Sequence, residues 1–192
     1  RQTRRNDVSA YVRVHSPKTG VKAIRRVIRL VEKTFSYVHF CHVSSVAELA
    51  FILEAKEKGL PITCEVTPHN ILLTITHLKP YGNLALTNPP LRTRKDVKAL
   101  WNAFQRGLID IVASDHAPHA IEEKKAESVW DAKSGLPGLE TMLPLLLTQV
   151  NRGQLKISDL VRASSEKPAQ IFHLKNRGNI AAGNWADLTV VD

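Results

Sequence analysis

The sequence has 192 residues, of which 43% are hydrophobic and 23% are charged. These proportions are typical of a globular domain and exclude a disordered chain, a collagen and a low-complexity linker. The longest apolar runs fall far short of the roughly 20 residues that cross a bilayer, and no signal segment opens the chain. Only two cysteines are present, Cys41 and Cys64, so a disulfide framework is excluded and a reducing cytoplasm is favoured.

The 27 basic and 18 acidic residues give a net charge of +9 at pH 7. A basic balance can indicate nucleic acid, anionic lipid or an anionic small molecule as partner. The residues Lys22, Arg25, Arg26 and Arg29 have the spacing of a solvated helix face, and the aromatic residues form no stacking platform among basic ones. We therefore expect a small-molecule substrate, and neither nucleic acid nor a membrane as partner.

Helices and short apolar strands alternate along the chain. In chain order, the expected elements are a helix at 21–33, a strand at 37–43, a helix at 46–58, a strand at 61–66, an ambiguous segment at 71–78, a strand at 84–87, a helix at 95–107, a strand at 108–113, a polar loop at 122–133, helices at 138–150, 157–165 and 168–172, and short strands in 178–192. This alternation, with strands that lack polar positions, indicates βα units around a parallel sheet.

Polar side chains follow each of the four expected strands, in the order His42, His69, Asn88 and Asp115. In parallel βα folds the chemistry lies at the carboxyl ends of the strands. Imidazole and carboxylate groups are ordinary zinc ligands, and an open coordination position makes such a site catalytic. A lone histidine is more often a core or surface residue, but three such groups at successive strand ends favour a metal site.

Strand geometry selects among neighbouring candidates. His39 and His42 are three residues apart, so a strand directs them to opposite faces. We expect His42, nearer the carboxyl end, to be the ligand and His39 to be structural. By the same argument Asp115, rather than His116, is the expected ligand and general base. His119 lies in a proline-containing loop, from which it can reach back over the site as a cation or donor.

The two cysteines fall within expected strands. Cys41 belongs to the run at 37–43 and Cys64 to the run at 61–66. A free cysteine in such a place is most often a small buried hydrophobic residue. We expect both side chains to be buried and neither to take part in the chemistry.

Motifs in series along the chain resemble those of the dihydroorotase family, a branch of the amidohydrolase superfamily of TIM barrels. They are Phe40-Cys41-His42-Val43-Ser44, Cys64-Glu65-Val66-Thr67-Pro68-His69, Asn88-Pro89-Pro90-Leu91-Arg92, Ser114-Asp115-His116-Ala117-Pro118-His119, and Gly138-Leu139-Glu140-Thr141 followed by Leu143-Pro144-Leu145-Leu146. Each motif alone is a weak signal, but their order and spacing are specific. The resemblance extends over nearly the whole chain from about Val21.

The resemblance implies an α/β fold of the (β/α)8 TIM-barrel type, with this chain covering about strands 5–8. Residues 1–177 would form the C-terminal half of a metal-dependent hydrolase barrel, and residues 178–192 the start of a flanking β-sandwich segment. The family's His-x-His pair on strand one and its carboxylated lysine on strand four have no counterpart in the sequence. The chain also begins with Arg1 and ends in an apolar run. We expect the second half of a protein of roughly twice this length, incomplete and inactive alone.

The resemblance also implies a metal centre. His42 and His69 match the histidine ligands of barrel strands five and six, which hold the more exposed of two zinc ions. Asp115 matches the strand-eight ligand of the more buried zinc, and this carboxylate doubles as the proton shuttle. Many members have a second histidine after the first, where this chain has Asn70, but that second histidine is not the ligand.

Four further residues match the substrate contacts of the family. Asn88 matches a residue that hydrogen-bonds the pyrimidine ring, and His119 matches one that holds the substrate carboxylate. Ser134 and Gly135 match a backbone contact to the ring. Dihydropyrimidinases, hydantoinases and allantoinases generally lack the counterpart of His119, which therefore favours an acidic substrate.

The function implied is that of a zinc-dependent dihydroorotase, which reversibly cyclises N-carbamoyl-L-aspartate to L-dihydroorotate in pyrimidine biosynthesis. One alternative is another cyclic-amide hydrolase, such as an allantoinase or a dihydropyrimidinase-like enzyme. Another is a non-catalytic, dihydroorotase-like partner of aspartate carbamoyltransferase. That transferase is the usual partner in the family. Self-association is the alternative, because it would bury the apolar faces that an incomplete barrel leaves without partners.

Overall fold

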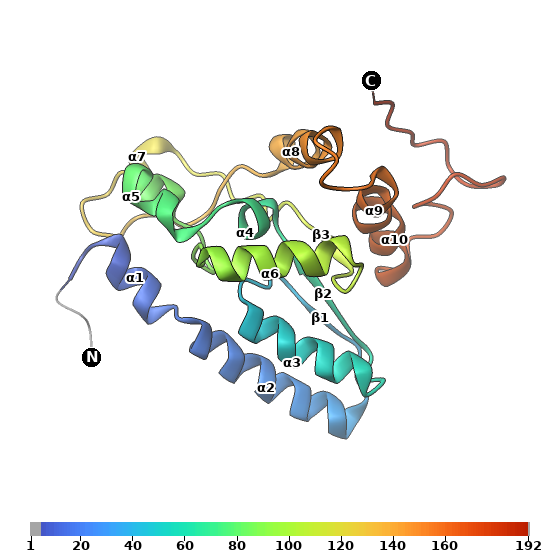
Figure 1. The fold of residues 1–192 in the computed structure, drawn as a ribbon, viewed down its shortest axis with the longest axis horizontal. Coiled ribbons are helices and arrows are strands. Elements are labelled where there is room, and N and C mark those ends of the chain that lie inside the picture. The colour runs from blue at the N-terminus through green and yellow to red at the C-terminus, as the bar shows by residue number, and fades with distance from the viewer. Residues whose placement is uncertain (1–4, 192) are drawn as a thin grey trace.

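A computed structural model describes residues 5–191. Within them a small parallel sheet lies at the centre of the fold, formed by β1 (Val38–Phe40), β2 (Ile62–Val66) and β3 (Ile111–Val112) in that spatial order (Figure 1). Residues Val38 to Phe40 pair with Ile62 to Cys64, and Glu65 and Val66 pair with Ile111 and Val112. The predicted parallel βα arrangement is therefore confirmed.

Helices surround this sheet. They are α1 (Val8–Val14), α2 (Pro17–Thr34), α3 (Val46–Glu57), α4 (Pro68–Leu72), α5 (Leu78–Tyr81), α6 (Arg94–Gln105), α7 (Ile121–Lys124), α8 (Leu139–Asn151), α9 (Ile157–Val161) and α10 (Lys167–Ile171), with 3-10 turns η1 (Ile75–His77) and η2 (Gly82–Ala85) and a π-helical turn η3 (Arg162–Glu166). Helices α2, α3 and α6 pack in series, and α9 and α10 lie at the end of the molecule away from α1 and α5 (Figure 1).

One main hydrophobic core joins the sheet to its helices. It includes Ile28 of α2, Ile52 of α3, Cys64 of β2, Phe104 of α6 and Leu146 of α8, all of them buried. The apolar spacing that predicted these helices is thus the spacing of the side chains that face the sheet. Burial of this shared surface is the main force that holds the βα units together.

Local signals set the ends of the long helices. A capping box begins α3, where the side chains of Ser45 and Glu48 each bond the other's backbone, and a second one, of Thr93 and Asp96, begins α6. Helix α2 begins at Pro17 and ends before Phe35, whose backbone is left-handed. These termini lie within a few residues of those predicted from the sequence.

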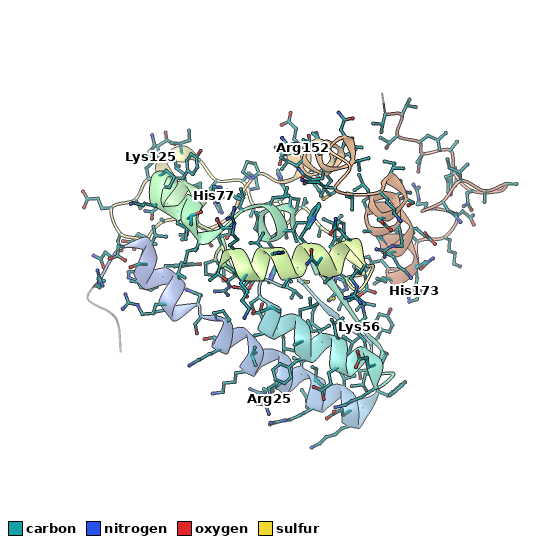
Figure 2. The ribbon with its side chains drawn as sticks, in the orientation of Figure 1. Arg25, Lys56, His77, Lys125, Arg152 and His173 are labelled. Carbon is teal, nitrogen blue, oxygen red and sulfur yellow. The ribbon has the colours of Figure 1, made fainter. Side chains whose placement is uncertain are left out.

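An ion pair joins α3 to the segment before β3, near the amino end of that strand and therefore away from the predicted site at the carboxyl ends. The ammonium of Lys56 donates to Asp110 Oδ2 at 2.6 Å and to the carbonyl oxygen of Leu108 at 3.1 Å (Figure 2). Asp110 Oδ2 also accepts the backbone N–H of Cys64 at 2.8 Å. One half-buried carboxylate therefore joins α3, β2 and the segment that enters β3.

Several sequence predictions were wrong in detail. The expected strand at 84–87 is absent from the described residues, where η2 is followed by a single extended residue, Leu86. Leu86 packs in a small separate cluster with Tyr11, Val129 and Ala132, so its burial does not come from the sheet. The ambiguous segment 71–78 forms helical turns, and residues 178–191 contain turns but none of the predicted strands. No described helix is both long enough and apolar enough to cross a membrane.

Candidate functional site

Three predicted ligands meet at the carboxyl edge of the sheet. His42 follows β1, His69 lies in the first turn of α4 after β2, and Asp115 follows β3. The charges of both Asp115 and His42 act on the pKa of His69, so the three side chains lie near one another. The residues that the strand-end argument had selected thus lie at one edge of the sheet, but among the described residues their ligand atoms do not all lie within 4.8 Å of one another, as those of His39, Cys41 and Glu65 do.

The backbone turns sharply at two of these positions. His42 has a φ of +37° and Asp115 a φ of +45°, both in the left-handed region that non-glycine residues rarely adopt. β1 has already ended at Phe40 and β3 at Val112. The alternation of a strand therefore does not direct these two side chains, and the turn after each strand does. Backbone strain of this kind concentrates at functional sites.

His69 is a buried imidazole with an unsatisfied nitrogen. Only 7% of the residue is exposed, and its Nε2 has no hydrogen-bond partner among the described residues. The pKa of His69 is lowered to about 4, mainly by burial; the charge of Asp115 opposes this shift and the charge of His42 adds to it. The ring is therefore neutral at pH 7, which is the form that binds a metal. A buried nitrogen without a partner is itself unfavourable, and this one fits a metal ligand.

A second group of donors lies beside β1 and β2. Ligand atoms of His39, Cys41 and Glu65 all lie within 4.8 Å of one another. His39 bonds through Nδ1 to Thr63 Oγ1 at 2.8 Å and through Nε2 to Glu65 Oε2 at 3.0 Å. The backbone N–H of His42 donates to Glu65 Oε1 at 3.3 Å, which connects this group to the predicted ligands.

The sequence analysis missed this second group. Cys41 is exposed and not buried as predicted, because β1 ends before it, whereas Cys64 is buried as predicted. Although the residue is exposed, partial desolvation of its sulfur raises the pKa of Cys41, and the charges of Glu65 and Asp115 raise it further. Glu65 was not singled out, although an acidic side chain inside an otherwise apolar strand is a usable signal. Imidazole, thiol and carboxylate together form a donor set suited to a divalent transition metal.

A buried polar network anchors the turn that carries His42. Glu48 Oε2 accepts the backbone N–H groups of Ser44 and Ser45, at 3.0 and 2.8 Å, and the hydroxyl of Ser44 at 3.0 Å. Arg92 Nε donates to the Ser44 hydroxyl at 3.0 Å. Ser44, Ser45, Glu48 and Arg92 are all buried, so this network fixes the chain directly after His42.

The predicted substrate residues lie on segments that meet beside Asp115. Asn88 is exposed and follows Leu86, whose carbonyl oxygen accepts the N–H of Gly135 at 2.8 Å. Ser134 precedes Gly135 and hydrogen-bonds the side chain of Tyr11. His119 lies 3.7 Å from Glu123, measured from Nδ1 to Oε2. Asn88 therefore lies on the segment after Leu86, Ser134 and Gly135 lie on one loop, and His119 lies on another. Hydrogen bonds from Gly135 to Leu86 and from Ala117 to Leu136 connect the three.

A small cavity of about 120 Å³ adjoins His69. Its walls include Ser114 from the segment before Asp115 and the stretch from Leu136 to Gly138, with Leu72 and Leu145 from α4 and α8. The cavity is mainly apolar and opens beside the strand ends. It gives the site a hydrophobic wall on the side of α8.

Parallel βα units whose strand ends gather imidazole, thiol and carboxylate donors define an α/β protein with a candidate metal centre. The chain belongs to the amidohydrolase family, whose model matches residues 6–192. This family and the solved structures below give it a TIM-barrel-type fold.

Curated relatives are dihydroorotases and a larger protein. The chain is 40% identical over 188 residues to the dihydroorotase of Methanothermobacter thermautotrophicus, a match that covers 98% of this chain and 42% of that protein. It is 44% identical over 167 residues to multifunctional protein CAD of Squalus acanthias, covering 86% of this chain and 7% of that protein. The chain therefore spans less than half the length of the curated relatives it matches.

Similar solved structures are hydantoinases. The L-hydantoinase (dihydropyrimidinase) of Arthrobacter aurescens superimposes with a TM-score of 0.91 at 32% identity, covering 95% of this chain and 42% of that one. The D-hydantoinase (dihydropyrimidinase) of a Thermus species gives a TM-score of 0.81 at 32% identity, covering 86% and 38%. The backbone described here is thus similar to parts of hydantoinases of longer chain.

Proposed function

We propose that this chain is the C-terminal part of a zinc-dependent dihydroorotase. The observation that carries the proposal is that His42, His69 and Asp115 follow the three strands at one edge of the sheet, where the charges of His42 and Asp115 act on the buried His69. The 40% identity to dihydroorotases, against 32% to the hydantoinases of known structure, supports this choice over another cyclic-amide hydrolase.

Residues 1–177 would then belong to the barrel and residues 178–192 would begin a flanking β-sandwich segment. The described sheet has three strands where the sequence predicted four, and β1, β2 and β3 would then correspond to strands five, six and eight of the barrel. The remaining strands, with the first metal ligands of the family, would come from the rest of the protein. A cytoplasmic location, and association with aspartate carbamoyltransferase or with a second copy, complete the proposal.

The donor set fits two zinc ions in the complete site. His42 and His69 would hold the more exposed ion and Asp115 the more buried one, and the unpartnered Nε2 of His69 supports this assignment. Bound zinc would lower the pKa of water so that hydroxide is available near neutral pH. The group of His39, Cys41 and Glu65 lies next to these ligands and offers a second set of donors.

The residues of this chain supply proton transfer and substrate binding. When dihydroorotate is hydrolysed, water adds to a ring amide carbon, the carbon–nitrogen bond breaks, and a proton passes to the leaving nitrogen. Asp115 would accept the proton of the attacking water and deliver it to that nitrogen. Asn88 would bind the pyrimidine ring and His119 its carboxylate, with the backbone of Ser134 and Gly135 contacting the ring. The reverse reaction closes N-carbamoyl-L-aspartate.

A comparison of substrates tests the proposal. In the full protein we expect turnover of dihydroorotate to exceed that of dihydrouracil, hydantoin and allantoin. A preference for hydantoin or dihydrouracil would instead support the alternative that the hydantoinase structures favour. If no cyclic amide is hydrolysed although metal is bound, the non-catalytic, dihydroorotase-like role is supported and the proposal is wrong.

A further inference from the structure

Lys124, at the end of α7, is a buried ammonium that forms no ion pair with an acidic side chain of residues 5–191. Only 6% of the residue is exposed. Its Nζ donates to the carbonyl oxygens of Gly135 at 2.6 Å, Lys133 at 3.2 Å and Leu86 at 3.5 Å. Burial lowers the pKa of Lys124, and no carboxylate of the described part of the chain counteracts this shift. An ammonium has three N–H donors, so this set of carbonyl oxygens uses all of them.

The three carbonyl oxygens belong to the segments that carry the proposed substrate contacts. Lys133 and Gly135 flank Ser134, and Leu86 lies two residues before Asn88. A single side chain therefore joins the segments of three of the four proposed contacts. The fourth, His119, is linked to the same helix through Glu123, whose Oε2 also accepts the backbone N–H of Ala120 at 2.9 Å.

The far side of the loop is fixed against the segment that follows Asp115. The N–H of Ala117 donates to the carbonyl oxygen of Leu136 at 3.0 Å, and His116 and Leu136 form a parallel bridge. Gly135 has a φ of +144°, and a Cβ there would lie 2.6 Å from the carbonyl oxygen of Ala117. The loop thus lies between Ala117 and the ammonium of Lys124 with no room to move toward the strand end.

We propose that Lys124 is a positioning residue for substrate recognition, because it holds the loop of Ser134 and Gly135 against the segment of Asn88. The inference rests on the proposed function and extends it to a residue that touches neither metal nor substrate. An ammonium buried among carbonyl oxygens is an unfavourable way to fill space, since an apolar side chain needs no desolvation of a charge. Its value lies in fixing several carbonyl groups at once, which no neutral side chain of this length can do.

The first test uses Lys124→Met, which is one atom shorter than lysine, stays unbranched and removes all its donors. The matched control is Lys125→Met, because Lys125 is the adjacent lysine and its side chain is exposed (Figure 2). In the full protein we expect Lys124→Met to raise the KM for dihydroorotate by about 10-fold, with kcat within about 3-fold and metal content unchanged. Lys125→Met should match the wild type. An unchanged KM in Lys124→Met would overturn the proposal.

A second readout does not depend on activity. Amide hydrogen exchange at Gly135, whose N–H donates to Leu86, should be about 10-fold faster in Lys124→Met and unchanged in Lys125→Met. If the wild-type protein neither binds nor hydrolyses dihydroorotate, the proposed function fails. The exchange rates then still decide the role of Lys124. Faster exchange of Gly135 in Lys124→Met supports Lys124 as the residue that holds the loop, and an unchanged exchange rate overturns that role.

A milder variant covers the case in which Lys124→Met does not fold. Lys124→Gln keeps two N–H donors on a shorter stem, so it should give the same pattern with a smaller change in KM and in the exchange of Gly135. Lys124→Arg retains the charge and should lie nearer to the wild type than Lys124→Gln. The reverse order, or wild-type values in Lys124→Gln, would contradict a role that depends on the ammonium and its donors.

Discussion

Asp115 is the residue in which the proposed chemistry is concentrated, since its carboxylate is assigned both a metal and a proton. It lies on a backbone with a φ of +45°, directly after the apolar stretch of β3. Such a turn moves the carboxylate off the strand and toward His42 and His69. A strained backbone that carries an acidic side chain is typical of a residue kept for function and not for the stability of the fold.

Replacement of this carboxylate should abolish most of the activity. In the full protein we expect Asp115→Asn, which keeps the shape of the side chain, to lower kcat by about 100- to 10,000-fold, as for other lost acid–base groups. The control is Asp131→Asn, at an exposed aspartate in the loop before Ser134. Steady-state kinetics and metal analysis check both variants. A variant of Asp115 that retains a tenth of wild-type activity would contradict the assignment.

His119 should behave differently from the proposed metal ligands. We expect His119→Ala to raise the KM for dihydroorotate and to leave the zinc content of the full protein intact, because the ring would hold only the substrate carboxylate. His173→Ala is the control, since His173 lies beside α10 and its side chain is exposed (Figure 2). Loss of zinc in His119→Ala would make His119 a ligand and show that its loop has been misinterpreted.

The buried ring of His69 gives the metal-free protein a pH dependence of known sign. The folded pKa is about 4 and the ordinary value is 6.5, so the unfolded chain takes up the proton first as the pH falls. The stability that neutral His69 contributes is therefore fully present above about pH 6.5 and is lost as the pH falls toward 4. The free energy of unfolding should decrease by on the order of 3 kcal/mol over this range. Urea unfolding at several pH values should show this loss, and His69→Gln should reduce it while His173→Gln does not. Equal slopes in all three proteins would contradict the burial of this ring.

At the scale of elements, the start of α3 fixes the end of β1. Glu48 closes the capping box of the helix and binds the two residues that follow Val43, while Arg92 reaches the same point from the segment before α6. The helix cap and the position of the proposed ligand His42 are therefore not independent. A change in this network should act on stability first and on the site through it.

Glu48→Ala should lower the free energy of unfolding by about 2–4 kcal/mol. The substitution leaves the buried N–H groups of Ser44 and Ser45 unsatisfied and removes one of the two carboxylates whose charges act on Arg92, the other being that of Asp96. Glu57→Ala is the control on the same helix, because that side chain is exposed. Urea denaturation measures both changes. Equal stability of the two variants would show that the buried network contributes little.

The sequence predicted the elements well where buried apolar residues recur at helical spacing over several turns. Helices α2, α3, α6 and α8 each contribute buried side chains to the main core, and their limits were predicted within a few residues. The short helices α1 and α7 were not predicted, because few of their residues belong to the core. The wrong strand at 84–87 has a similar cause: Leu86 is buried by α1 and the loop around Val129, a contact that local sequence does not reveal.

The candidate site was predicted where it depends on the order of the strands, and missed where it depends on their register. His42, His69 and Asp115 follow from the rule that parallel strands place their carboxyl ends at one edge. The contact of His39 with Glu65 arises from the pairing of β1 with β2 and joins residues 26 positions apart. Cys41 joins this group because β1 stops one residue earlier. Neither feature is visible in the pattern of a single segment.

At the scale of the whole molecule, the described sheet has edges formed by β1 and β3. Parallel sheets in α/β folds are covered on both faces and, in a barrel, have no edges, since eight strands close on themselves. The curated relatives are more than twice as long as the matched part of this chain, as the 42% coverage indicates. Both the closure of the sheet and the full set of metal ligands would therefore depend on residues outside this span.

Residues 1–192 expressed alone should accordingly not hydrolyse dihydroorotate. His42, His69 and Asp115 cannot give each of two zinc ions the usual four donors, and an open sheet would leave apolar strand and helix faces without partners. We expect at most one weakly bound zinc ion per chain, held through His42 and His69, and either self-association or poor solubility. Elemental analysis, light scattering and a ring-opening assay on the purified span would test this, with the full protein as the control. Two tightly bound zinc ions and measurable turnover in a monomer would show that three strands suffice for the site.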